Sequence, residues 1–86
     1  MAMEKGFNSD VSVKGVDYHV QTEDWGQANP YLVSQVFREG AVVKSIKTSY
    51  DEVLPQGPTS QSSAIRLAMR VQHQKILDLL LSGQLL

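Results

Sequence analysis

The polar residues that could carry chemistry are few, and the densest group is Asp17, His19, Gln21 and Glu23, which alternate with other residues along one segment. This spacing places all four on one face of a strand, where an imidazole and a carboxylate could contribute to a metal or small-ligand site. Zinc requires three or four ligands, however, and the chain has only one other histidine, His73. A ligand or metal site near His19 and Glu23 is therefore kept as a hypothesis, while the favoured interpretation is a solvated strand face with no metal ligand.

The segment 23–30 combines carboxylates, an amide and the only tryptophan, and it ends at a proline, which is typical of a loop. Calcium would require six to eight oxygen ligands at ordered spacing, which this segment does not show. Its tryptophan either closes the end of the core or anchors a protein partner, because tryptophan is enriched at interface hot spots. The predicted partner-binding residues are Trp25, Asp24 and Tyr31.

No arrangement typical of an enzyme is present. The serines lie outside the G-x-S-x-G and S-x-x-K motifs, there is no cysteine, and the glycines occur singly instead of in a phosphate-binding loop. We therefore predict no enzymatic activity, no catalytic residue and no cofactor.

The balance of charge also disfavours nucleic-acid binding. Eight Lys and Arg residues stand against nine Asp and Glu residues, for a formal net charge of -1, whereas surfaces that bind DNA or RNA are usually strongly basic. Nucleic-acid binding remains an alternative, in which a small dimeric regulator contacts phosphates through Lys44, Lys47, Arg66 and Arg70. We expect His73, on the same helix edge as the two arginines, to be partly exposed.

The elements that must position these residues are predicted from hydrophobic periodicity. Residues 6–48 alternate between apolar and polar positions, with two-residue turns at Lys14-Gly15 and Glu39-Gly40 that predict two tight hairpins. Together these hairpins predict a four-stranded antiparallel β-meander. With no irregularity in the second hairpin, Ile46 would share a face with Tyr31 and Val33.

Helical signals follow the sheet. Residues 49–60 predict a short helical turn, with Ser49 and Glu52 spaced as a capping box, and then a Pro/Gly linker. Residues 61–82 predict a long C-terminal helix that packs on the sheet. The expected caps of this helix are Ser60 or Ser62 at its start and Gly83 at its end.

The long helix carries more apolar surface than one chain can cover. Its main stripe should lie on the sheet, yet further apolar residues occupy other sides of the helix, and the second hairpin is partly apolar on both faces. A chain of 86 residues buries only about 60–65% of the surface that its unfolded form exposes. We therefore predict a homodimer. The stripe on the sheet is Ile65, Ala68, Met69, Ile76, Leu79 and Leu80. The predicted dimer interface is Leu67, Val71, Leu77, Leu81, Val36 and Val43.

Residues 1–86 are thus predicted to form a single domain of the α+β class. The first residues lack the apolar core of a signal peptide, and no run reaches the roughly 18 apolar residues of a membrane span. Together with the absence of cysteine, this predicts a cytoplasmic protein without a membrane-bound segment.

Four sequence runs resemble a group of small bacterial proteins to which no activity is attached. The runs are FNSDV (7–11), YHVQTEDWG (18–26), NPY (29–31) and KTSY (47–50). The resemblance implies a bacterial source and no catalytic residue. We therefore expect a non-enzymatic protein–protein interaction module, a bacterial adaptor or regulator that acts as a homodimer with an unidentified protein partner. The alternatives are a nucleic-acid-binding small dimeric regulator and a small-ligand or metal-binding domain.

Overall fold

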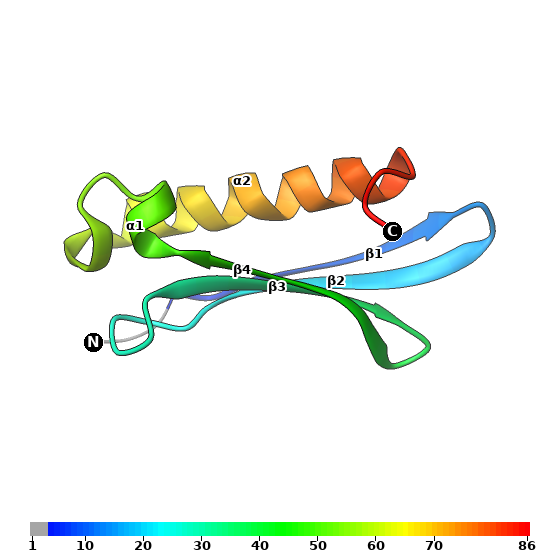
Figure 1. Cartoon of the computed structure of the whole chain (residues 1–86), viewed down its shortest axis with the longest axis horizontal. Coiled ribbons are helices and arrows are strands. Elements are labelled where there is room, and N and C mark those ends of the chain that lie inside the picture. The colour runs from blue at the N-terminus through cyan, green and yellow to red at the C-terminus, as the bar shows by residue number, and fades with distance from the viewer. Residues whose placement is uncertain (1–3) are drawn as a thin grey trace.

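The computed structural model describes residues 4–86 and shows a four-stranded antiparallel sheet with a long helix along one face (Figure 1). The strands lie in the order β1-β2-β3-β4, so β1 and β4 are the two edges. This confirms the predicted α+β meander with a C-terminal helix. Residues 1–3, which the single-domain prediction includes, lie outside the described residues. The elements are β1 (Phe7–Val13), β2 (Val16–Asp24), β3 (Tyr31–Arg38), β4 (Ala41–Ser49), α1 (Tyr50–Val53), the 3-10 turn η1 (Gly57–Thr59) and α2 (Ser62–Leu81).

Both tight hairpins form as predicted. Lys14 and Gly15 have φ angles of 52° and 80°, and Glu39 and Gly40 have the same pair of values. Two consecutive residues with positive φ are the signature of the type I′ turn, whose twist matches the twist of antiparallel strands. The glycine in each turn adopts this conformation without the steric cost that a side chain would bring.

A β-bulge in the second hairpin changes which residues face the helix. The register shifts between Val36 and Phe37, so Ile46 pairs with Ser34 and Lys47 pairs with Val33. The prediction that Ile46 shares a face with Tyr31 and Val33 is therefore wrong. An extra residue in one strand reverses the alternation beyond it, which no simple period-two pattern can represent.

The ends of the helices are capped locally. Ser49 and Glu52 form the predicted capping box of α1, in which the Ser49 side chain accepts a hydrogen bond from the backbone N–H of Asp51 (3.2 Å). At the other end of the chain, Gly83 has a φ of 78°, and the N–H of Gln84 donates to the carbonyl oxygen of Leu79 (2.9 Å). That bond belongs to a Schellman motif and confirms the predicted end of the long helix.

The start of α2 differs from the prediction. Its N-cap is Gln61, whose side chain makes no capping hydrogen bond, in place of Ser60 or Ser62.

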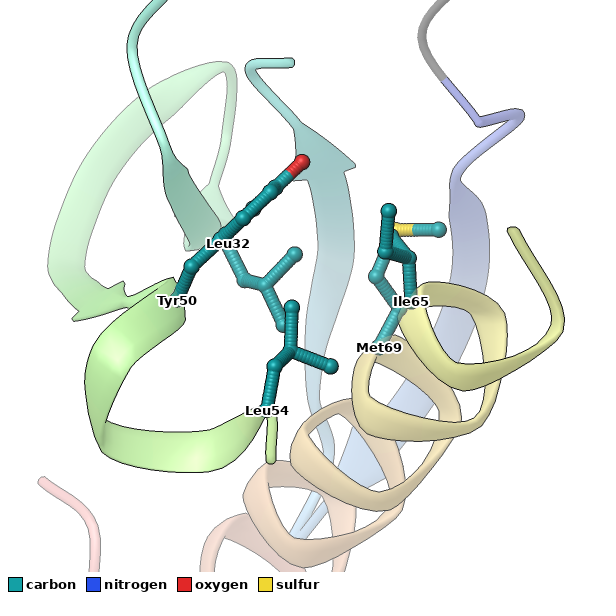
Figure 2. Close-up of a cluster of buried hydrophobic side chains, with 5 residues drawn as sticks. All are labelled: Leu32, Tyr50, Leu54, Ile65 and Met69. Carbon is teal, nitrogen blue, oxygen red and sulfur yellow. The ribbon is translucent and has the colours of Figure 1, made fainter. Parts of the chain in front are cut away.

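The core consists of two apolar clusters between α2 and the sheet. Figure 2 shows the first, in which Leu32 of β3 packs with Tyr50 of α1, with Leu54 directly after α1, and with Ile65 and Met69 of α2. The second lies near the C-terminal end of α2. Its buried members are Val20, Val36, Ile76 and Leu80.

A buried carboxylate joins the loop after β2 to α1 and to the N-terminal segment. Asp24 is 6% exposed and accepts hydrogen bonds from the Tyr50 hydroxyl, from the backbone N–H of Gly26 (2.9 Å) and from that of Glu4 (3.0 Å). Burial, followed by the hydrogen bond to Asp24, raises the pKa of Tyr50 above its ordinary value. The phenol therefore stays protonated and remains a donor to the carboxylate.

Replacement of Tyr50 by Phe should lower the free energy of unfolding by about 1–3 kcal/mol, because a buried carboxylate loses a hydrogen-bond donor. Urea unfolding followed by circular dichroism measures this change. Tyr31→Phe is the matched control, since Tyr31 lies only partly buried on the opposite face of the sheet, and its effect should stay within about 0.5 kcal/mol. Equal effects of the two variants would contradict a specific role for the Asp24–Tyr50 bond.

Candidate protein-interaction surface

A belt of polar side chains crosses the core between its two apolar clusters. His73 on α2 is 6% exposed, its Nε2 lies 2.8 Å from Ser9 Oγ, and its Nδ1 lies 2.7 Å from Thr22 Oγ1. Thr22 Oγ1 lies 2.7 Å from Ser34 Oγ, which accepts a hydrogen bond from Gln72 Nε2 (2.9 Å). We refer to these five residues as the polar belt.

The expectation that His73 is partly exposed is therefore wrong. The buried residues of α2 are Ile65, Met69, His73, Ile76 and Leu80, at helical offsets of 0, 4, 8, 11 and 15. His73 occupies the central position of the buried stripe, because hydroxyl groups from the strands satisfy both of its ring nitrogens. The offset of four from Met69 was the sequence signal that could have located it.

The distance between the Ser9 hydroxyl and His73 is the one expected between a catalytic nucleophile and its base. The surroundings of the two residues differ from those of a catalytic pair. In such pairs a third group, usually a carboxylate, orients the base, whereas Nδ1 of His73 faces the hydroxyl of Thr22. Burial, and secondarily the charge of His19, lowers the pKa of His73 below its ordinary value. The imidazole is therefore held neutral inside the core, where it bridges α2 to β1 and β2.

The outer face of the sheet, away from α2, carries the residues of the ligand-site hypothesis. His19 Nδ1 lies 2.8 Å from Asp10 Oδ1, and its Nε2 lies 3.2 Å from Asn8 Oδ1. Glu23 instead accepts a hydrogen bond from the Gln21 side chain. Over residues 4–86, no group of three or more His, Asp or Glu side chains is placed to hold a metal ion.

The predicted partner-binding residues divide between the core and the surface. Asp24 is buried and bonded within the chain, so its assignment to a partner contact is wrong. Trp25 is 41% exposed and belongs to neither core cluster, so it does not close the core. The Lys47 ammonium lies 5.1 Å from the Trp25 ring centroid and 4.2 Å from that of Tyr31. Trp25 and Tyr31 thus form an aromatic surface around one lysine.

The four basic residues of the nucleic-acid hypothesis do not share one surface. Lys47 lies on the outer face of the sheet, whereas Lys44 pairs with Val36 on the helix-covered face. Arg66 lies 5.6 Å from the Phe7 ring centroid beside β1. Such dispersed charges make no continuous track for a phosphate backbone.

Some residues of the predicted dimer interface are exposed in the structure, and others are buried. Leu67 and Val71 are exposed by 58% and 59%. Leu81 and Val43 are exposed too, whereas Leu77 is partly buried against the second core cluster. Val36 is 1% exposed inside that cluster, so its assignment to an intermolecular interface is wrong. Val36 shares the face of Leu32 and Ser34, which is the face that α2 covers.

An apolar groove separates α2 from the edge strand β4. It arises because α2 packs mainly on β1 and β2, which leaves the β4 side of the helix-covered face open. The groove has a volume of about 730 Å³. Its walls include Ile46 and Thr48 of β4, Val53 at the end of α1 with the next two residues, and Leu67, Val71 and Lys75 of α2. We call it the α2–β4 groove.

The groove is the best candidate for a functional surface on this chain. Contiguous apolar surface on a small protein usually marks a site of interaction with a protein or a ligand. Leu67 and Val71 flank this groove, so the structure brings together two of the residues that the sequence assigned to an interface. Sequence periodicity alone did not indicate that β4 would form the opposite wall.

Comparison of the chain with protein-family models, with curated protein sequences and with solved structures finds no match. Within residues 4–86, no helix combines the length and the apolar character needed to cross a membrane.

The burial of neutral His73 predicts that stability depends on pH. Because the pKa of His73 is lower in the folded chain than in the unfolded chain, the unfolded state binds more protons as the pH falls below about 6.5. The free energy of unfolding should therefore be highest above this pH, decrease as the pH falls, and stop responding to this group below its folded pKa. Urea unfolding at a series of pH values between 7 and 5 measures the slope.

His73→Gln should remove most of that slope, while His19→Gln, which changes the partly exposed histidine on the outer face, should retain most of it. A slope that disappears in the His19 variant and persists in the His73 variant would contradict this assignment.

Proposed function

We propose that this chain is a non-enzymatic protein–protein interaction module, a bacterial adaptor or regulator that acts as a homodimer. The α2–β4 groove is the surface that the two copies share. The bacterial part of the proposal rests on the sequence resemblance alone.

The observation that carries the proposal is the exposure of Leu67 and Val71 beside an apolar groove. Burial of the exposed parts of these two side chains in both copies would contribute about 4–7 kcal/mol, at about 1.5–3 kcal/mol for each fully buried side chain. A micromolar complex requires about 8 kcal/mol after the costs of association. Other parts of the groove must therefore contribute, and Val53, which is 44% exposed, is a further apolar side chain in its wall.

The non-enzymatic part of the proposal is supported by the setting of the Ser9–His73 pair. His73 projects from α2 into the core, where it is 6% exposed, and its second nitrogen contacts a hydroxyl. This burial leaves little of the imidazole accessible to a substrate.

An adaptor also needs a second surface that stays free when the groove is filled. Trp25 and Tyr31 supply one on the outer face of the sheet, opposite α2, where Lys47 packs on both rings. Exposed aromatic residues are among the side chains most enriched at interface hot spots, which supports Trp25 as the anchor of a protein partner.

Replacement of Val71 by Glu should weaken the dimer about 100-fold or more, because the two-fold axis places two unpaired charges in the apolar contact. Sedimentation equilibrium at micromolar concentrations measures the dissociation constant. Leu81→Glu is the matched control, since Leu81 is 55% exposed on the same helix but does not line the groove. A wild-type chain that stays monomeric, or a dimer weakened by Leu81→Glu and not by Val71→Glu, would contradict the proposal.

A further inference from the structure

The exposed wall of the α2–β4 groove is a single ridge of the helix. Leu67, Val71 and Lys75 are spaced by four residues, so their side chains follow one row along α2. At a rise of about 1.5 Å per residue, Leu67 and Lys75 lie about 12 Å apart, with Val71 midway between them. A second helix can pack against such a row at an interaxial distance of about 8–10 Å.

The two ends of this ridge differ in charge. At the Leu67 end, the groove is bounded by Val53 of α1, the short helix that also carries the exposed carboxylates Asp51 and Glu52. Figure 1 shows α1 beside the N-terminal part of α2. At the other end, the groove is bounded by the exposed ammonium group of Lys75. Lys75 therefore makes one end of the groove basic, whereas the exposed carboxylates of α1 lie beside its other end without lining it.

This asymmetry selects one arrangement of two copies. In a closed dimer the same patch faces itself across a two-fold axis. If the axis passes near Val71 and the helices run antiparallel, the Lys75 end of each copy meets the acidic α1 end of the other. If the helices ran parallel, each Lys75 would face its own counterpart, and like charges repel.

Pairing of the two copies through their β4 edges is disfavoured. Lys44 and Lys47 are exposed on β4, and the hairpin contains a β-bulge. Lysines and bulges are the features that natural sheets use to prevent their edges from pairing.

We infer that a second copy of this chain occupies the α2–β4 groove in an antiparallel two-fold arrangement. The α2 helices cross near Val71, and Lys75 of each copy approaches the acidic helix α1 of the other. This arrangement rests on the proposed function and specifies its geometry.

Because the chain contains no cysteine, single cysteine variants test the arrangement directly. Val71→Cys should give a disulfide-linked dimer on mild oxidation, since both copies of this residue lie at the axis. Leu67→Cys should link poorly, because its two copies would lie about 12 Å apart along the helices, beyond the reach of a disulfide. Leu81→Cys and Ser45→Cys are the controls for the far end of α2 and for the β4 edge.

Charge reversal provides a second, independent readout. Lys75→Glu and Asp51→Lys should each weaken the dimer about tenfold at low salt, because each replaces two attractive contacts by repulsive ones. The double variant should dimerise more tightly than Lys75→Glu alone, because the lysine introduced at position 51 attracts the introduced glutamate while Glu52 still repels it. Sedimentation equilibrium measures all four proteins, and Gln74→Glu serves as a control for a charge added elsewhere on α2.

The outcomes separate the arrangement from the function on which it rests. A wild-type dimer that links through Val71→Cys and is tighter in the double variant than in Lys75→Glu supports the antiparallel arrangement. A dimer that links through Leu81→Cys or Ser45→Cys instead, or that is no tighter in the double variant than in Lys75→Glu, overturns the arrangement and leaves the homodimer in place. A wild-type chain that stays monomeric overturns both, and the groove would then have to accept a different protein.

Discussion

One helix cannot cover a four-stranded sheet, and this limit shapes the rest of the structure. Strands spaced about 4.8 Å apart place the two edge strands about 14 Å apart, whereas a helix with its side chains is about 10–12 Å wide. Here α2 packs mainly on β1 and β2, and α1 with Leu54 covers the nearby end of β3. What remains open is the space between α2 and β4, which is lined by apolar residues.

The polar belt explains why α2 stays on the β1 side of the sheet. His73 and Gln72 reach hydroxyl groups on β1, β2 and β3, and each of these hydroxyls would lose its contact with α2 if the helix moved toward β4. Buried polar groups without partners are costly, so the belt resists sliding and rotation of the helix. The same contacts keep Leu67 and Val71 on the opposite side of α2, where the chain cannot bury them. Stability within one chain and an exposed apolar surface on α2 thus have a common origin.

Sequence patterns predicted the features that depend on neighbouring residues. The Lys14-Gly15 and Glu39-Gly40 turns, the Ser49 capping box and the Gly83 helix end all follow from local backbone chemistry. The features that escaped prediction depend on tertiary contacts: the bulge that turns Ile46 toward the helix, the burial of His73, and the enclosure of Asp24 by Tyr50. The α2 wall of the groove could be predicted from the apolar positions of the helix. The β4 wall could not, because its prediction depends on the register of the sheet.

We propose that two copies together cover the surface that one chain leaves open. Small-angle X-ray scattering of the wild-type chain over a concentration series tests this proposal, because it gives both mass and size. The two-copy arrangement predicts a mass that rises toward twice 9.5 kDa, with a radius of gyration clearly above the 13.2 Å of the single chain. A mass of 9.5 kDa and an unchanged radius of gyration up to millimolar concentration would contradict it.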